Sequence, residues 1–204
     1  GQMLVLYLLC TKLSYEQKSI NKKDYQKKIK DLLSLSKSAK NTLNIEDKIQ
    51  TLGKDFANSK GSMFLGRGYS YPIALEGALK LKELAYVHAE GYPAGEMKHG
   101  PLALIEEGMP VVVIAPRDEH YKKTISNMQE VISRGAKVLL ITNKSTDEIY
   151  SENIWEQIEV DAISDELIPF LTTIPLQKLA YYSALDKGYD IDKPRNLAKS
   201  VTVE

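Results

Sequence analysis

The chain has 204 residues, of which 43% are hydrophobic and 26% are charged, and its 27 basic and 27 acidic residues give a formal net charge of zero. This composition is typical of a folded globular protein with one substantial core, and it excludes a disordered chain. The lack of a basic excess argues against a nucleic-acid partner, because phosphate binding requires a surplus of Lys and Arg. A single cysteine, Cys10, excludes an intrachain disulfide, fits a cytoplasmic protein, and stands in an apolar run where we expect it to be buried.

Residues 1–58 are expected to be helical throughout. They begin with the apolar run MLVLYLLC at 3–10, which is far shorter than the roughly 20 residues that cross a bilayer, so we expect no membrane partner. A lysine-rich amphipathic stretch, KKDYQKKIKDLLSLSKSAKNTL, follows, and we interpret its lysines as a solvated helix face. An apolar start without an initiator methionine or a helix cap suggests a domain from a longer polypeptide.

From residue 60 onward, apolar runs of strand length alternate with amphipathic helices. Continuous Val and Ile runs indicate strands that are buried on both faces, as in a parallel sheet covered by helices. We therefore predict an α/β fold: a three-layer, doubly wound, mostly parallel five-stranded sheet of the flavodoxin-like kind, with an N-terminal helical segment. The strands are expected at 62–66, 110–116, 137–142 and 157–160, with a weaker one at 87–92. Helices are expected at about 71–86, 118–134 and 166–187, the last interrupted or delayed by Pro169 and Pro175.

The loop Gly66-Arg67-Gly68, directly after the first predicted strand, has two readings. Doubly wound sheets bind ligands at the carboxyl ends of their strands, near helix N-termini, and this loop stands at such a place. The third glycine of a dinucleotide fingerprint and the lysine of a Walker motif are both absent. The loop is therefore either a ligand loop or a tight strand-to-helix turn with a surface arginine.

Two further groups of residues could carry chemistry. Glu76, Lys80 and Glu83 are spaced four and then three apart, so they share one face of the predicted helix. Lys98 and His99, in GEMKHGP, stand between two glycines, which places them on a turn or at a helix end. Glutamate–lysine pairs usually decorate a helix surface, and a lone histidine near a turn is usually structural, so composition alone assigns neither group a function.

Two long motifs, in this order, resemble the isomerase region of the glutamine:fructose-6-phosphate aminotransferases, also called glucosamine-6-phosphate synthases. They are GRGYSYPIALEGALKLKELAYVHAEGYPAGEMKHGPLALI, which starts at Gly66, and DKPRNLAKSVTVE, which ends the chain. The resemblance implies a sugar isomerase (SIS) fold. The family makes glucosamine 6-phosphate from fructose 6-phosphate and glutamine-derived ammonia, with no metal and no nucleotide cofactor. Its full-length members carry a glutaminase domain and two SIS subdomains, which implies a linking segment at 1–58, a SIS domain at 59–190 and a tail over the sugar site at 191–204.

The resemblance also implies roles for individual residues. Lys199 would form a Schiff base with the C2 carbonyl of the open-chain ketose, which requires a deprotonated amine. Glu83 would carry a proton between C1 and C2, a task favoured by burial of the carboxylate. Lys80 would stabilise charge on the sugar oxygens. His99 would open the sugar ring from the neighbouring subunit, which implies a homodimer with shared active sites.

The tail residues Arg195, Asn196 and Ala198 would contact the substrate and help to close the site, as in the family. The serine- and threonine-rich loop with which the family holds the sugar phosphate has no counterpart here, so we expect it in the first SIS subdomain. This chain alone should therefore not make glucosamine 6-phosphate. A non-catalytic module that senses phosphosugars through the same fold is the alternative, and the terminal lysine argues against it because a sensor needs no imine-forming amine.

Overall fold

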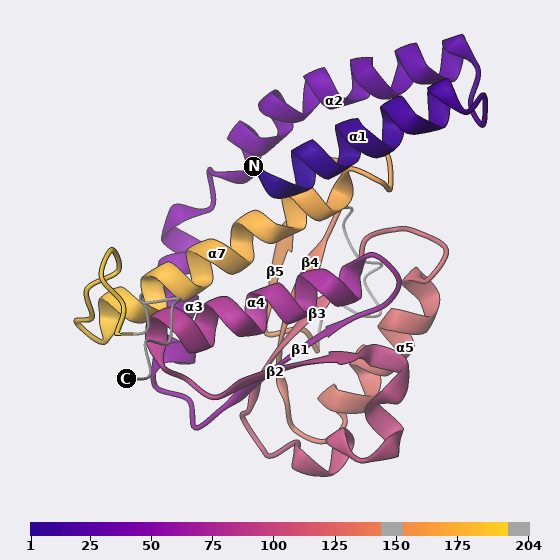
Figure 1. Cartoon of the computed structure of the whole chain (residues 1–204). Coiled ribbons are helices and arrows are strands. Elements are labelled where there is room, and N and C mark those ends of the chain that lie inside the picture. Colours follow the sequence, from indigo (N-terminus) through magenta and orange to yellow (C-terminus); the bar gives the residue numbers. More distant parts are fainter. Residues whose placement is uncertain (144–152, 196–204) are drawn as a thin grey trace, which may run out of the picture.

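The computed structural model of this chain describes residues 1–143 and 153–195, which form a layered α/β domain with a projecting pair of helices (Figure 1). Within those ranges the sheet has five parallel strands in the order β2-β1-β3-β4-β5. The predicted α/β fold is confirmed, and the weaker strand expected at 87–92 is the edge strand β2. The strands are β1 (Ser62–Gly66), β2 (Ala89–Pro93), β3 (Pro110–Ile114), β4 (Lys137–Thr142) and β5 (Glu156–Glu159).

Alternate residues of each central strand enter two separate cores, one on each face of the sheet. Phe64 and Val112 pack with helices α3 (Glu46–Ala57), α4 (Ser70–Ala85) and α7 (Ile168–Asp186). Met63 and Val111 pack on the other face, with α5 (Tyr121–Ile132) and the short helix η1 (Ala94–His99), which precedes η2 (Pro101–Leu104). Because both faces are covered, successive strand residues must be apolar, which is why β1 and β3 read as unbroken apolar runs.

Helix α7 is continuous through Pro175, so the predicted interruption is wrong, and the predicted alternative holds, because the helix starts at Ile168, two residues later than expected. Pro169 lies in the first turn, where its missing N–H costs nothing. Pro175 lies inside the helix, with its side chain buried. The missing N–H of Pro175 is the one that would otherwise bond the carbonyl of Leu171, four residues earlier. Packing of α7 against α3 and α4 outweighs the cost of the internal proline.

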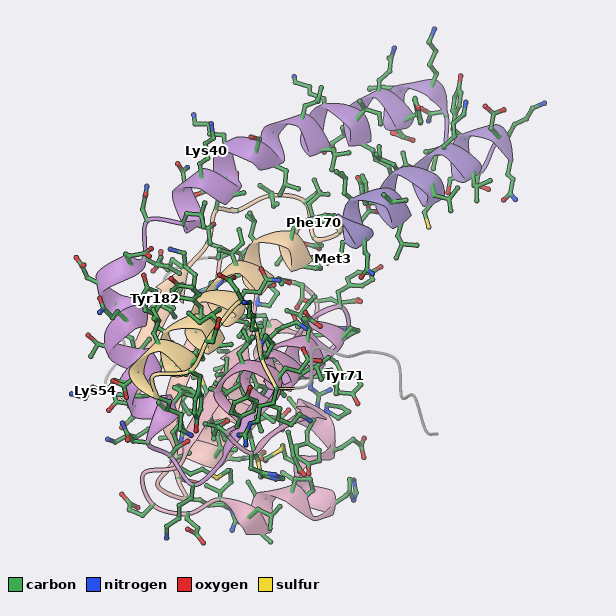
Figure 2. All side chains as sticks on the ribbon, turned by 60° about the vertical axis from the view of Figure 1, so that its left-hand side comes forward. Met3, Lys40, Lys54, Tyr71, Phe170 and Tyr182 are labelled. Carbon is green, nitrogen blue, oxygen red and sulfur yellow. The ribbon has the colours of Figure 1, made fainter. Side chains whose placement is uncertain are left out.

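The first two helices, α1 (Gln2–Glu16) and α2 (Lys22–Thr42), form a hairpin that stands away from the sheet (Figure 1). Figure 2 shows side chains projecting into solvent from both helices, with Lys40 among them. The helical character predicted for residues 1–58 is confirmed. The expected burial of Cys10 is wrong, because this thiol is exposed. Several large apolar side chains of α1 are exposed as well: Leu4, Val5, Leu6, Leu8, Leu9 and Leu13.

Contacts made by α1 explain this exposure. Tyr7 meets the ring of Phe170 edge to face at 6.4 Å, and Tyr15 stacks on Tyr25 at 4.6 Å. These contacts cover one side of the helix and leave the rest of its apolar surface open. No helix in residues 1–143 or 153–195 combines the length and the apolar character needed to cross a bilayer.

Candidate active site

Helix α4 carries candidate catalytic residues away from the usual ligand edge of the sheet. It begins at Ser70, just after the carboxyl end of β1, and runs back until Ala85, shortly before β2 begins beside the start of β1. With a rise of about 1.5 Å per residue, Lys80 and Glu83 lie roughly 15 to 20 Å along the helix from its start. They therefore lie toward the amino ends of the strands.

Lys80 joins two carboxylates on this part of α4. Its Nζ lies 2.7 Å from Oε2 of Glu83 and 3.7 Å from Oε1 of Glu76. The hydrogen bond to Glu83 is the main cause that raises the pKa of Lys80; the charge of Glu76 adds to it and partial burial opposes it. Lys80 is thus held as a cation, which suits it to neutralise negative charge on a ligand and not to act as a base.

Glu83 lies open to solvent in the described part of the chain. Its side chain is 42% exposed, and that of Lys80 is 29% exposed. Both side chains are accessible to a ligand. The burial of Glu83 that favours proton transfer from carbon is therefore not provided by the described residues alone, and another segment or chain would have to supply it.

The C-terminal tail reaches this same end of α4. The backbone N–H of Arg195 donates to the hydroxyl of Tyr86 at 2.8 Å, and its guanidinium carbon lies 3.7 Å from the centroid of the Tyr86 ring. Tyr86 caps α4, three residues after Glu83. Three other predicted site residues, Asn196, Ala198 and Lys199, lie outside the described residues.

His99, which follows strand β2, lies on the other face of the sheet from Glu83. It is exposed at the end of η1, which follows the carboxyl end of this strand. Ala94 and Met97 of η1 belong to the core that includes α5, whereas α4 packs in the core on the other face of the sheet, so the fold does not bring His99 and Glu83 together within one chain. The neighbouring Lys98 forms an ion pair with Glu130 of α5, with 3.0 Å between Nζ and Oε1.

For the loop Gly66-Arg67-Gly68, the structure favours the turn over the ligand loop. A side chain at Gly66 would come within 2.3 Å of the carbonyl oxygen of Ser70, so only glycine fits this tight turn. The Nε and Nη2 groups of Arg67 donate to Oδ1 of Asn127 at 3.2 and 3.1 Å. The loop stands at the carboxyl edge of the sheet, where a ligand would be expected. Its guanidinium, however, is used to connect the loop to α5.

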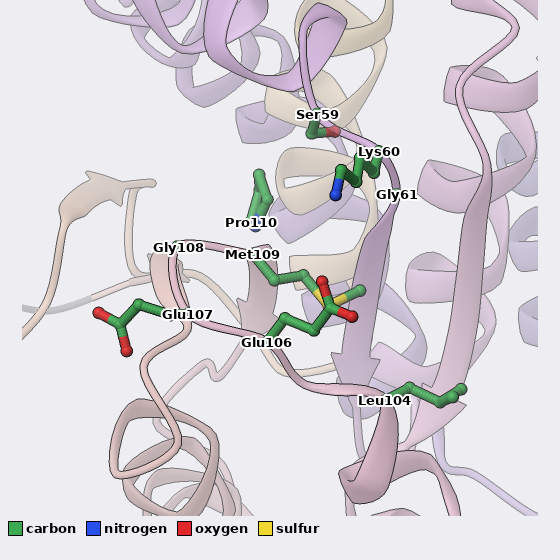
Figure 3. A pocket seen from close by; sticks show the side chains of 9 residues that line it. All are labelled: Ser59, Lys60, Gly61, Leu104, Glu106, Glu107, Gly108, Met109 and Pro110. Atoms are coloured by element: carbon green, nitrogen blue, oxygen red, sulfur yellow. The ribbon is translucent and has the colours of Figure 1, made fainter.

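A pocket of about 390 Å³ opens at the amino ends of β1 and β3 (Figure 3). The predicted site residues are not among its lining residues, which are Ser59, Lys60, Gly61, Leu104, Glu106, Glu107, Gly108, Met109 and Pro110. Among the residues that the structure describes, no group of three or more His, Cys, Asp or Glu side chains is arranged to hold a metal ion.

Sequence reasoning missed Tyr86 and Tyr189, whose rings lie 4.8 Å apart beside Arg195. The sequence held only a weak indication that Tyr86 is unusual. Helices commonly end on a glycine in the left-handed conformation, and the absence of glycine after Ala85 could have drawn attention to Tyr86.

Comparisons with known proteins show the family and the fold of this chain. The family model for the SIS domain matches residues 55–186. The glutamine–fructose-6-phosphate aminotransferase (isomerizing) of Bacteroides thetaiotaomicron is 49% identical over the whole chain, and that of Aquifex aeolicus is 45% identical. The chain spans only 33% of the length of each of these relatives.

Two solved structures extend the comparison. The C-terminal domain of glucosamine-fructose-6-phosphate aminotransferase from Francisella tularensis is 39% identical, with a TM-score of 0.86 over 95% of this chain and 55% of that one. The sugar isomerase domain of an RpiR transcription factor from Sphaerobacter thermophilus is 12% identical, with a TM-score of 0.61 over 78% of this chain and 92% of that one, so it shows the fold alone. The family match over most of the chain, on a five-stranded parallel sheet, shows that this chain belongs to the SIS domain family.

Proposed function

We propose that this chain is the C-terminal SIS subdomain of a glucosamine-6-phosphate synthase. Within the longer polypeptide it would take part in converting fructose 6-phosphate and glutamine-derived ammonia to glucosamine 6-phosphate. The observation that carries this proposal is the meeting of the tail with the end of α4, where Arg195 lies on Tyr86, close in sequence to Glu83. A non-catalytic sensor would have no use for a terminal lysine delivered to a glutamate–lysine pair.

Each group has a chemical role in this reaction. The amine of Lys199 adds to the C2 carbonyl of the open-chain ketose and loses water to give the imine. Ammonia then adds to C2 and displaces the Lys199 amine, which leaves an imine of ammonia at C2 whose C1 protons are acidic. The Glu83 carboxylate takes a proton from C1 and returns it to C2. Lys80, held protonated by its carboxylate neighbours, stabilises negative charge that develops on the sugar oxygens.

The protein would act in the cytoplasm as a homodimer, with His99 of each copy opening the sugar ring in the site of the other. Support comes from the placement of His99, which is exposed at the end of η1, on the other face of the sheet from Glu83, and so is available to a second copy. A histidine shared in this way makes each site incomplete in a monomer.

The remaining parts of the site would come from upstream domains: a glutaminase domain and a first SIS subdomain that holds the phosphate. The exposed apolar surface of α1 supports a further packing partner, because a helix that is apolar on most sides is normally covered. Relatives about three times as long as this chain supply the domain context. Leu6→Lys in the full-length protein should lower its melting temperature far more than Leu33→Lys on the exposed side of α2.

Trapping of the imine tests the proposal directly. Full-length protein is incubated with fructose 6-phosphate and sodium borohydride, and peptide mass mapping locates any reduced hexose phosphate adduct. We expect the adduct on Lys199 and its loss in Lys199→Arg, while Lys193 in the same tail stays unmodified. A wild-type protein that turns over substrate without any adduct on Lys199 would refute the imine role of Lys199. A wild-type protein that binds fructose 6-phosphate but gives neither product nor adduct would favour the sensor reading.

A further inference from the structure

Tyr86 adopts a backbone conformation that side chains usually avoid. It ends α4 with φ 54° and ψ 34°, in the left-handed region. Among the described residues, only Lys18 shares a positive φ without being glycine. This conformation is unfavourable for a residue with a Cβ and persists where surrounding contacts hold it, often at functional sites. The contacts of Tyr86 therefore indicate what the conformation is for.

Two residues from the C-terminal part of the chain, Tyr189 and Arg195, hold Tyr86 in place. Its hydroxyl accepts the backbone N–H of Arg195 at 2.8 Å, and its ring lies under the Arg195 guanidinium at 3.7 Å. The ring of Tyr189 lies 4.8 Å from that of Tyr86, with the planes inclined by 57°. The Arg195 guanidinium also lies 6.0 Å from the Tyr189 ring. We call Tyr86, Tyr189 and Arg195 the tail clamp.

The end of α7 delivers Tyr189 to this position. Gly188, with φ 69°, reverses the chain after the helix, and the N–H of Tyr189 donates to the carbonyl of Ala184 at 3.0 Å. Lys187 reaches across to the carbonyl of Ala85 at 3.2 Å, so it joins the C-terminal ends of α7 and α4. The two helix ends are thereby fixed to each other beside the clamp.

A tight turn then leads from Tyr189 to Arg195. One carboxylate oxygen of Asp190 accepts the N–H groups of Asp192 and Lys193, at 3.0 and 3.1 Å. This side-chain turn bends the tail back so that Arg195 meets Tyr86. The path of the tail is thus fixed by named contacts up to four residues before Lys199.

We propose that Tyr86 and Tyr189 are positioning residues that hold the tail, through Arg195, so that Lys199 is presented to the site beside Glu83. This inference rests on the proposed imine role of Lys199. Arg195 then acts through the clamp, in addition to the contact with the substrate and the closing of the site that the resemblance to the family implies. The left-handed turn at Tyr86 directs the ring toward the tail at the very point where the helix that carries Glu83 ends.

Substitutions at Tyr86 separate the clamp from general stability. Tyr86→Asn suits the left-handed conformation but removes both the ring and the hydroxyl. Tyr86→Phe keeps the ring and loses only the hydrogen bond, and Tyr181→Leu replaces an exposed tyrosine of α7 as a matched control. Hydrogen exchange of tail peptides and the rate of borohydride trapping on Lys199 are measured in the full-length protein, together with the melting temperature.

Tyr86→Asn should speed exchange in the tail by about fivefold or more and slow adduct formation by a similar factor, with little change in melting temperature. In Tyr86→Phe, the exchange rate of the tail and the rate of adduct formation should both lie within about threefold of wild type. Tyr181→Leu should change neither rate. Wild-type exchange in Tyr86→Asn, or faster exchange with an unchanged adduct rate, would overturn the positioning role. A wild-type protein without any adduct would instead refute the role of Lys199, while tail exchange would still report whether the clamp exists.

Discussion

The two edges of the sheet differ in what they leave available to a ligand. At the carboxyl edge, where doubly wound sheets usually bind ligands, Arg67 is bonded to Asn127 and Gly68 packs against His120. Toward the amino edge, Lys80 and Glu83 keep solvent-accessible side chains. Helix α4 thus carries candidate catalytic groups from the usual binding edge of the sheet to its amino edge. There they lie on a surface that other segments can complete.

The largest effect expected from this comparison is at the amino edge. In the full-length protein, Glu83→Gln should lower the rate of glucosamine 6-phosphate formation by about 10² to 10⁴, because the proton transfer at carbon loses its base. Hydrolysis of glutamine should continue, since it needs a different domain. Assays of both products in one protein preparation measure the two effects together. Normal synthesis by the variant would remove Glu83 from the mechanism.

Mixing two inactive variants tests whether the amino edge is completed by a second copy. His99→Ala and Lys199→Ala should each be inactive alone, and their one-to-one mixture should recover about a quarter of wild-type activity. Half of randomly assorted dimers are mixed, and each mixed dimer has one intact site if His99 acts across the interface. Subunits are exchanged under mild denaturation, and mixed dimers are confirmed by two different affinity tags. Inactive mixed dimers would contradict the shared site.

The sheet could be predicted from the sequence because burial on both faces leaves an unmistakable pattern. Val111 and Val112 enter opposite cores, so both must be apolar, and strand β3 is visible without any structure. The path of α7 through Pro175 was not predictable in this way, because tertiary packing decides it. The exposure of Cys10 could not be predicted for the same reason. An apolar run indicates that a helix surface is suited to packing against another segment, but it does not show whether that segment is present.

The candidate site was predictable only in its local parts. The pairing of Lys80 with Glu83 follows from their spacing on one helix, and the structure confirms their contact at 2.7 Å. The contact between Tyr86 and Arg195 joins residues that are 109 positions apart, so no periodic pattern can reveal it. Resemblance to a family marked the tail as functional, but the tertiary fold identifies what holds it.

A substitution at the carboxyl edge should affect stability and leave the chemistry intact. Gly68→Ala places a Cβ at φ 52°, where it would lie 2.6 Å from the His120 ring. We expect the free energy of unfolding to fall by about 1 to 2 kcal/mol, with turnover per folded protein unchanged. Gly108→Ala is the matched control, because its φ is 78° and no atom lies near its would-be Cβ. Loss of turnover in stable, folded Gly68→Ala would show that this edge also serves the reaction.

The smallest effect concerns Asp118, which follows β3 at the carboxyl edge. Burial is the main cause that raises the pKa of this carboxyl above its usual 3.8, and the charge of Asp165 adds to it, although the N–H of His120 donates to Asp118 Oδ1 at 2.8 Å. A raised pKa means that the folded state binds the proton more tightly than the unfolded state. Asp118 therefore favours folding below its usual pKa, and that contribution is lost as the pH rises through the raised value.

Asp118→Asn should consequently stabilise the protein at pH 7, by at most about 1 kcal/mol, because the amide oxygen can still accept the N–H of His120 without carrying a charge. The gain in melting temperature should vanish near pH 3, where the wild-type carboxyl is protonated. Glu119→Gln, whose carboxylate is 87% exposed next along the chain, should give no comparable gain. A lower melting temperature for Asp118→Asn at pH 7 would show that the ionised carboxylate stabilises the folded state. The carboxyl edge would then hold a favourable charge in addition to the packing contacts of Arg67 and Gly68.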